Sequence, residues 1–177
     1  NWLLANRDQA TGLPYSHVGD GRFDGWAITY DSAVTALAYV AVERVADAKR
    51  ILDFYIQTPK VWRLGGIIEA VLPSRRDVLG VDWSVRTGSN LWMGIAGFHL
   101  YQATGDAQYL EFAKKLADFA MTLQNNDEKD PNFGGMRLGQ EGERIYPGDQ
   151  HLGYDLSQPR FFDIFATEHN IDAYALF

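Results

Sequence analysis

Cysteine is absent from the 177 residues, which excludes disulfide bonds and metal sites built on thiolates. The same absence leaves the cellular compartment open. Basic side chains are few: 16 Lys and Arg are outnumbered by 23 Asp and Glu, and the net charge is −7. Since phosphate backbones are bound by clustered Lys and Arg, this balance argues against a nucleic-acid partner.

Long apolar runs are absent as well. No segment approaches the ~20 apolar residues that a membrane-spanning helix requires, so we expect no membrane partner. No signal peptide is visible either. The first residue is Asn1 rather than Met, and "NWLLANRD" is typical of the last turns of a helix. We therefore expect an N-terminus that has been processed or cut.

What the sequence does contain is typical of a globular domain. Hydrophobic residues make up 46% and charged residues 22% of the chain, as in folded rather than disordered proteins. Aromatic residues are abundant, with ten Phe, nine Tyr and five Trp. Such side chains build cores, and they also line clefts in which sugars stack. We expect residues 1–177 to form a single domain that buries roughly 70% of the unfolded chain's surface.

Helical periodicity recurs along the chain in pairs of helices. Helical hairpins are predicted at about 31–57 and 89–124, and a third begins at about 167. The first hairpin is expected to break near Val45 to Asp47. In the second, Gly105 is expected to end one helix and Asp106 to cap the next.

The two helices of each hairpin differ in character. Gly94, Ala96 and Gly97 in a first helix allow close helix approach, although Gly costs about 1 kcal/mol relative to Ala in a helix interior. The second helices carry a charged face, so we expect them to form an outer layer around an inner layer of first helices. In the earliest first helix, the apolar positions with helical spacing are Val34, Leu37, Ala38, Ala41 and Val45.

The loops that follow the hairpins also repeat. The segments "LGGIIEAVL" (64–72) and "FGGMRLG" (133–139) each place a Gly-Gly pair before apolar residues. Both are predicted to form short β-hairpins. Their similarity indicates an internal repeat whose period varies with loop length.

This alternation resembles the six-hairpin (α/α)6 toroid of many glycoside hydrolases and related sugar-processing enzymes. The resemblance is carried by "YDSAVTALAY", "TGSNLWMGIAGFHLYQATGDAQYLEFAKKLADFA" and "TEHNIDAYALF". It implies an all-α fold of helical hairpins with short β-hairpins in the loops, and a substrate cleft at the N-terminal ends of the inner helices. It also implies a carbohydrate substrate, and it favours a secreted or periplasmic protein.

A complete ring needs more hairpins than this chain holds, so the chain resembles an incomplete (α/α)6 barrel. An open ring would expose the apolar sides of its end helices. We therefore expect the remainder of the toroid as a partner, either in the same chain or as a second chain.

Polar clusters lie where the predicted inner helices begin. The first, "GDGRFDGWAITYDS" (19–32), contains Trp26, Tyr30 and Asp31. It is either a turn-rich loop with Asp31 or Ser32 as the helix cap, or a cation site, although it lacks the full spacing of a calcium loop.

The second cluster is "VDWSVRTGSN" (81–90). Thr87, Ser89 and Asn90 are candidate caps of the helix. Capping does not explain the aromatic rings of Trp83 and Trp92 beside them. Such an arrangement suits a sugar, whose C–H faces stack on rings while its hydroxyls form hydrogen bonds.

The third cluster is "TEHN" at 167–170. Thr167 is a candidate N-cap, and Glu168 in the first turn favours the helix dipole. His169 and Asn170 have no evident role in starting the helix, although either could be a polar group of the core with its hydrogen bonds satisfied. Asp172 lies one turn after Glu168 on the same face, so repulsion and burial could hold one of the two carboxyls protonated.

Glycoside hydrolysis needs two carboxyl groups, one as acid and the other as base or nucleophile. We expect Glu168 and Asp31, on neighbouring repeats, to form this pair, with Asp172 as a further catalytic candidate. Neither a metal nor a cofactor is expected. The candidate substrate-binding residues are Trp26, Tyr30, Asp82, Trp83, Arg86, Asn90, Trp92, His169 and Asn170.

The leading functional hypothesis is a glycoside hydrolase acting on an oligo- or polysaccharide. One alternative is a sugar epimerase or isomerase on the same fold, in which His169 would be the general acid/base. The other alternative is a non-catalytic protein that binds glycans or scaffolds a complex. A serine triad is disfavoured, because no G-x-S-x-G motif occurs,.

Overall fold

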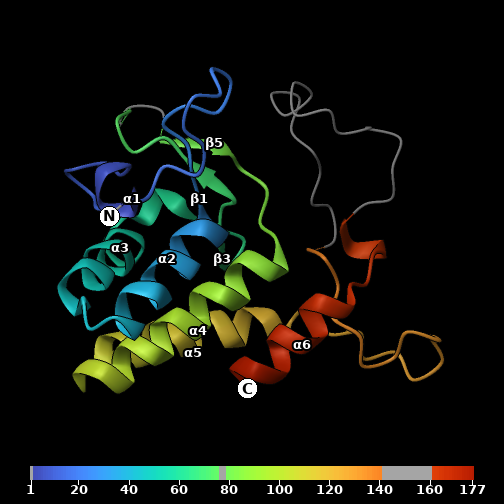
Figure 1. Cartoon of the computed structure of the whole chain (residues 1–177). Coiled ribbons are helices and arrows are strands. Elements are labelled where there is room, and N and C mark those ends of the chain that lie inside the picture. The colour runs from blue at the N-terminus through green and yellow to red at the C-terminus, as the bar shows by residue number, and fades with distance from the viewer. Residues whose placement is uncertain (1, 76–78, 141–160) are drawn as a thin grey trace.

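The computed structural model describes residues 2–75, 79–140 and 161–177. Five longer helices and a single-turn helix lie in these ranges, together with short 3-10 turns and short strands (Figure 1). The helices are α1 (Trp2–Ala5), α2 (Thr29–Ala41), α3 (Val45–Gln57), α4 (Thr87–Thr104), α5 (Ala107–Met121) and α6 (Thr167–Leu176). The strands are β1 (Ala27–Ile28), β2 (Trp62–Arg63), β3 (Gly66–Ile67), β4 (Ala70–Val71) and β5 (Gly80–Asp82).

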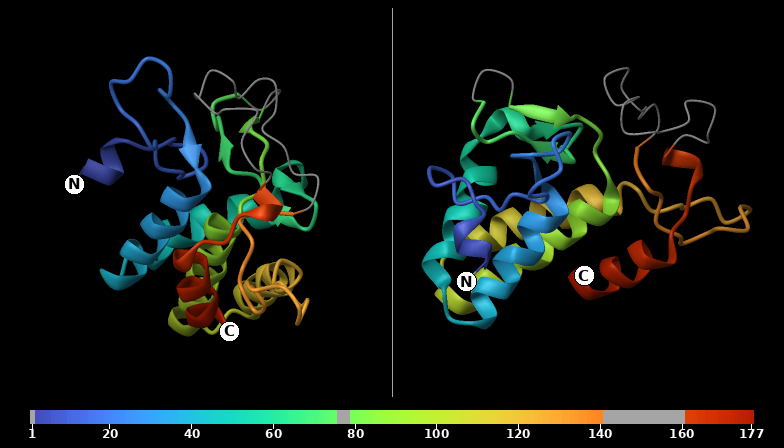
Figure 2. Two further views of the ribbon diagram at one scale, coloured as in Figure 1. Left: turned by 90° about the vertical axis from the view of Figure 1, so that its right-hand side faces the viewer. Right: turned by 45° about the horizontal axis from the view of Figure 1, so that its top comes forward.

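The helices pack in two layers. Helix α4 packs between α2 and α6, while α3 lies against α2 and α5 lies against α4 (Figures 1 and 2). The first helices of the hairpins thus form one layer and the second helices form another, as the sequence predicts. The chain is mostly helical, but the described residues do not close a ring. In the same residues, no helix is long and apolar enough to cross a membrane.

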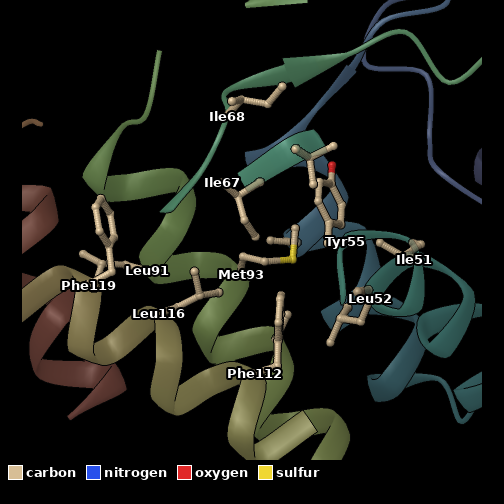
Figure 3. Packing of buried hydrophobic residues seen from close by; sticks show 14 of the residues in the cluster. Ile51, Leu52, Tyr55, Ile67, Ile68, Leu91, Met93, Phe112, Leu116 and Phe119 are labelled. Atoms are coloured by element: carbon tan, nitrogen blue, oxygen red, sulfur yellow. The ribbon is translucent and has the colours of Figure 1, made fainter. Parts of the chain in front are cut away.

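The core lies between the two layers. Figure 3 shows side chains from α3, α4 and α5 meeting under the strand that carries Ile67. Its fully buried members include Ile51, Leu52, Tyr55, Leu91, Met93 and Leu116. The hydroxyl of Tyr55 donates to Ser32 at 3.1 Å, which satisfies a buried polar group at the α2–α3 contact,.

The apolar face predicted for the first helix is correct only in part, since Leu37 and Val45 are half-buried against the core. Val34 is 38% exposed, and Ala38 and Ala41 are exposed too. The helix buries mainly small and polar side chains, because α3 and α4 pack closely against that side. The buried residues are Thr29, Ser32, Ala33, Thr35, Ala36 and Tyr39. The break between α2 and α3 also falls earlier than predicted, since α3 already begins at Val45.

The turn between α4 and α5 and the close approach of α6 follow the prediction. Gly105 ends α4 in the left-handed conformation at φ 69°, and the carboxylate of Asp106 accepts from the N–H of Gln108 at 3.2 Å. A Cβ on Gly94 would lie 2.8 Å from a methyl carbon of Leu176. The small residues of α4 therefore allow the inner helices to come together.

The strands form two small antiparallel sheets. Strands β2 and β3 form the hairpin predicted around the first Gly-Gly pair, and the other sheet has the order β1-β4-β5. The hairpin predicted at 133–139 is wrong. That segment instead makes isolated bridges, pairing Met136 with Gln124 and Arg137 with Phe165. Strand β1 runs directly into α2, so the larger sheet lies at the N-terminal end of that helix (Figure 1).

Each loop is fastened to the inner helix that precedes it. The N–H and hydroxyl of Thr29 donate to backbone carbonyls in 68–69, at 2.8 and 2.7 Å. One repeat later, the N–H and hydroxyl of Thr87 donate to backbone carbonyls in 137–138, the former at 2.9 Å. The two loops therefore occupy equivalent places.

The same loops are fastened to the inner helix that follows. The side-chain oxygen of Asn90 accepts from the N–H of Ile67 at 2.7 Å, and its NH₂ donates to the carbonyl four residues earlier at 2.8 Å. Asn170 repeats this with the N–H of Met136, at 3.1 Å, and the carbonyl four residues earlier, at 2.9 Å. Each loop is thus a clasp between two neighbouring inner helices, which supports the internal repeat.

These clasps replace the side-chain caps that the sequence suggested. The N-cap residues are Ile28, Arg86 and Ala166, and none of them makes a side-chain capping hydrogen bond. The predictions that Asp31, Ser32, Thr87, Ser89, Asn90 or Thr167 cap these helices are therefore wrong. Each helix begins at a Thr, and at Thr29 and Thr87 the hydroxyl is used by the loop instead.

Candidate active site

Two cavities lie at the N-terminal ends of the inner helices and share Glu69 and Arg86. The first, called here the His169 cavity, has a volume of about 280 Å³. It is lined by Tyr30, Glu69, Arg86, Gly88, Ser89, Leu138, Phe161, Glu168 and His169. The second, the Trp26 cavity, has a volume of about 210 Å³ and is lined by His17, Phe23, Trp26, Ile28, Glu69, Ala70, Asp82 and Arg86.

Glu69 is a carboxyl group in surroundings that disfavour its charge. It precedes β4, in the loop that clasps α2, and its side chain is only 12% exposed. One carboxylate oxygen accepts from the hydroxyl of Ser89 at 2.7 Å, and the other lies 4.0 Å from the guanidinium of Arg86. Burial raises the pKa of Glu69 to about 7, although Arg86 and Ser89 act in the opposite direction,. The group therefore exchanges protons near neutral pH.

No motif in the sequence points to Glu69. Its only signal was a lone charge inside the apolar stretch "GGIIEAVL". A solvent-facing strand position would explain that charge equally well. The pKa depends on burial and on Ser89 and Arg86, which come from another element of the fold.

Arg86 is held in place by polar contacts on one side. It donates to the carboxylate of Asp82 at 3.0 Å and to the hydroxyl of Ser84 at 3.1 Å. Asp82 is buried and also accepts from the N–H and hydroxyl of Ser84, at 2.9 and 2.6 Å. The guanidinium carbon lies 5.5 Å from the ring centre of Phe161. Arg86 is therefore a positioned cation at the boundary of the two cavities.

Helix α6 brings His169 and Glu168 into the first cavity. A Cβ on Gly88 would lie 2.7 Å from Nε2 of His169, so only glycine leaves room for this ring. Nδ1 of His169 is buried and has no hydrogen-bond partner within the described residues. Burial lowers the pKa of His169, and the charge of Glu168 opposes this in part. The imidazole is thus favoured in its neutral form.

Asp172 lies one turn further along α6 and is buried. Burial raises the pKa of its carboxyl group, and the charge of Glu168 raises it further. One of its oxygens has no hydrogen-bond partner in the described part of the chain. These surroundings disfavour the charged form of Asp172, which is the direction that the sequence predicts for this pair.

Helix α2 contributes Tyr30 to the opposite wall of the cavity. Its ring meets Trp92 edge to face, with 5.8 Å between the ring centres. Burial raises the pKa of Tyr30, and the charges of Glu168, Asp172 and Asp31 add to this. Asp31 is half-buried in the first turn of α2. Its expected pairing with Glu168 stays a prediction.

The remaining candidates occupy different places. Trp26 and Asp82 line the second cavity. The amides of Asn90 and Asn170 form the hydrogen bonds to the loops described above, which is a structural use other than helix capping. Trp83 is 37% exposed, and its ring lies against Gly80 on β5.

The acidic loop of the first cluster uses its carboxylates locally. Asp20 accepts from the N–H of Arg22, and Asp24 accepts from the N–H of Gly19, both at 3.1 Å. In residues 2–75, 79–140 and 161–177, no group of three His, Asp or Glu side chains could hold a metal ion. The carboxylates of Asp20 and Asp24 thus stabilise the turns of this loop.

No family model matches the chain, and no curated protein matches it. Among solved structures it is similar to a D-mannose isomerase, with a TM-score of 0.55 and 17% identity over 88% of this chain. The matched region is 40% of the isomerase chain, so this chain spans about two fifths of that protein's length. At such low identity, the likeness shows that the two proteins share a fold of packed helical hairpins.

Proposed function

We propose that the chain forms part of a sugar-processing enzyme, an isomerase or epimerase, which moves a proton on its substrate within the His169 cavity. The observation that supports this most directly is Glu69. Its carboxyl group has a pKa of about 7 and lines the same cavity as a buried histidine. A general base or acid is most effective when its pKa lies near the working pH.

The residues around this cavity suit proton transfer next to a carbonyl group. In its ionised form, Glu69 would remove the proton from the carbon beside the carbonyl. Neutral His169 would accept a proton from a substrate hydroxyl and, as the imidazolium so formed, give it to the carbonyl oxygen, while Glu69 would return its proton to carbon. The fixed charge of Arg86 would stabilise the negative charge that develops on oxygen. Tyr30 and Glu168 would bind hydroxyl groups at the rim.

The likeness to a D-mannose isomerase favours this proposal over the glycoside hydrolase that the sequence analysis put first. A hydrolase would need a carboxyl pair flanking a glycosidic bond. The expected pair, Glu168 and Asp31, has no support beyond the charge that both exert on Tyr30. An isomerase or epimerase would instead use Glu69, whose carboxyl group has its pKa raised to about 7 by burial.

The test is conversion of D-mannose and related aldoses by the full-length protein in D₂O, followed by NMR. An isomerase or epimerase would introduce deuterium at the carbon beside the carbonyl. Glu69→Gln should lower kcat/KM by about 10² or more. Glu111→Gln, at a side chain that is 68% exposed on α5, is the matched control. Glycoside cleavage without deuterium uptake, or an unchanged rate in Glu69→Gln, would overturn the proposal.

A further inference from the structure

The proton transfer proposed above takes place in the His169 cavity, and the Trp26 cavity adjoins it. Glu69 and Arg86 line both cavities. A ligand held against Arg86 in one cavity therefore lies next to the other cavity. The two volumes, about 280 and 210 Å³, are of similar size.

One wall of the Trp26 cavity is aromatic and comes from a single loop. The ring centres of Phe23 and Trp26 lie 5.2 Å apart, edge to face, and His17 lies 5.1 Å from Phe23. Ser16 closes the base of this loop. Its N–H donates to the carbonyl of Trp26, and its hydroxyl accepts from the N–H of Ile28, both at 2.8 Å. The aromatic wall is thus attached firmly to the start of α2.

Another part of the lining of the Trp26 cavity is polar and charged. Asp82 is buried and belongs to β5, and its contacts with Ser84 and Arg86 hold its carboxylate in place. Ligand pockets typically combine apolar or aromatic walls with a few placed polar groups. An aromatic face together with a fixed carboxylate and guanidinium suits a sugar ring, which has apolar C–H faces and hydroxyls at its edge.

We propose that the Trp26 cavity binds a second sugar unit, linked to the one that reacts in the His169 cavity. The preferred substrate is then a disaccharide or a longer glycan, and a free monosaccharide is converted less well. This inference rests on the proposed function, because it places the reacting unit at Glu69 and His169. The aromatic loop at 16–26 selects the substrate, while Glu69 and the N-terminal ends of the inner helices carry out the reaction.

The test compares D-mannose with β-1,4-mannobiose and cellobiose as substrates of the full-length protein. Trp26→Ala should raise KM for the disaccharides by about tenfold, as expected for a truncated aromatic anchor. KM for D-mannose should stay within about twofold, because Trp26 does not line the His169 cavity,. Trp2→Ala, at a tryptophan that is 58% exposed on α1, is the matched control.

A second variant and a binding measurement separate the two proposals. Phe23→Ala, which alters the same wall without removing Trp26, should also weaken the disaccharides selectively. Calorimetric titration with β-1,4-mannobiose measures binding even if the protein turns over no sugar. A lower affinity for mannobiose in Trp26→Ala than in the wild type would support the second subsite. Equal effects of Trp26→Ala on mannose and mannobiose, or a wild-type preference for free mannose, would overturn the second subsite and leave the proposed function standing.

Discussion

At the scale of single residues, Glu69 links the stability of the protein to its chemistry. A glutamate in an unfolded chain has a pKa of about 4.3, whereas burial raises the pKa of Glu69 to about 7. Between these two pH values the folded protein binds more protons at this site than the unfolded chain does. The free energy of unfolding that Glu69 contributes therefore falls as the pH rises through this window.

Replacing Glu69 by Gln removes this titration and keeps an oxygen that can accept from Ser89. Between pH 5 and pH 8, the wild-type free energy of unfolding should fall by up to about 3 kcal/mol more than that of Glu69→Gln. Urea unfolding at both pH values measures the difference. Parallel pH profiles for the two proteins would mean that Glu69 is not held in a desolvated site.

The residues of the candidate site were only partly predictable. Tyr30, Arg86, Glu168 and His169 were identified because polar side chains at the start of an apolar helix need an explanation. Glu69 was not, because its surroundings come from α4, which follows it in the sequence. A polar residue at a helix start can face a ligand or fasten a loop, and the sequence of one chain does not distinguish these uses.

At the scale of elements, the asparagine clasps hold the loops to the inner helices. Asn90 is fully buried and makes hydrogen bonds to both the N–H and the carbonyl of Ile67, at 2.7 and 3.0 Å. Its removal leaves these backbone groups without partners in a dry environment. Such groups cost about 1–3 kcal/mol when buried unsatisfied.

Asn90→Ala should therefore lower the free energy of unfolding by about 1–3 kcal/mol, and Asn170→Ala should lower it by a smaller amount. The difference follows from the burial, since Asn170 is only half-buried. Denaturant titrations give both values. Asn132→Ala, in an exposed turn, is the control. If Asn132→Ala lowered the free energy of unfolding as much as Asn90→Ala does, the hydrogen bonds of Asn90 to the loop would have no special role.

At the scale of the whole molecule, the two-layer arrangement was predictable and its detailed faces were not. Small residues in α4 and charged residues in α3 and α5 indicated which helices lie inside. The exposed Val34 shows the limit of that reasoning, because a helical pattern reveals a face but not which neighbour covers it. Helix α6 likewise exposes apolar side chains: Ile171 is 64% and Tyr174 is 89% exposed, and Phe177, directly after the helix, is 62% exposed.

We propose that the exposed face of α6 is covered by a further helical hairpin, from the same chain or a second one. Thr167 begins α6 as Thr29 and Thr87 begin their helices, and those two are each clasped by a loop. If a hairpin covers α6, Ile171→Ser should cost about 1.5–3 kcal/mol, the value of burying such a side chain. If the face is open, the cost should stay within about 0.5 kcal/mol, as at other surface positions. Val18→Ser, in the exposed loop at 17–25, gives that surface reference, so urea unfolding of the two variants decides between a covered and an open edge.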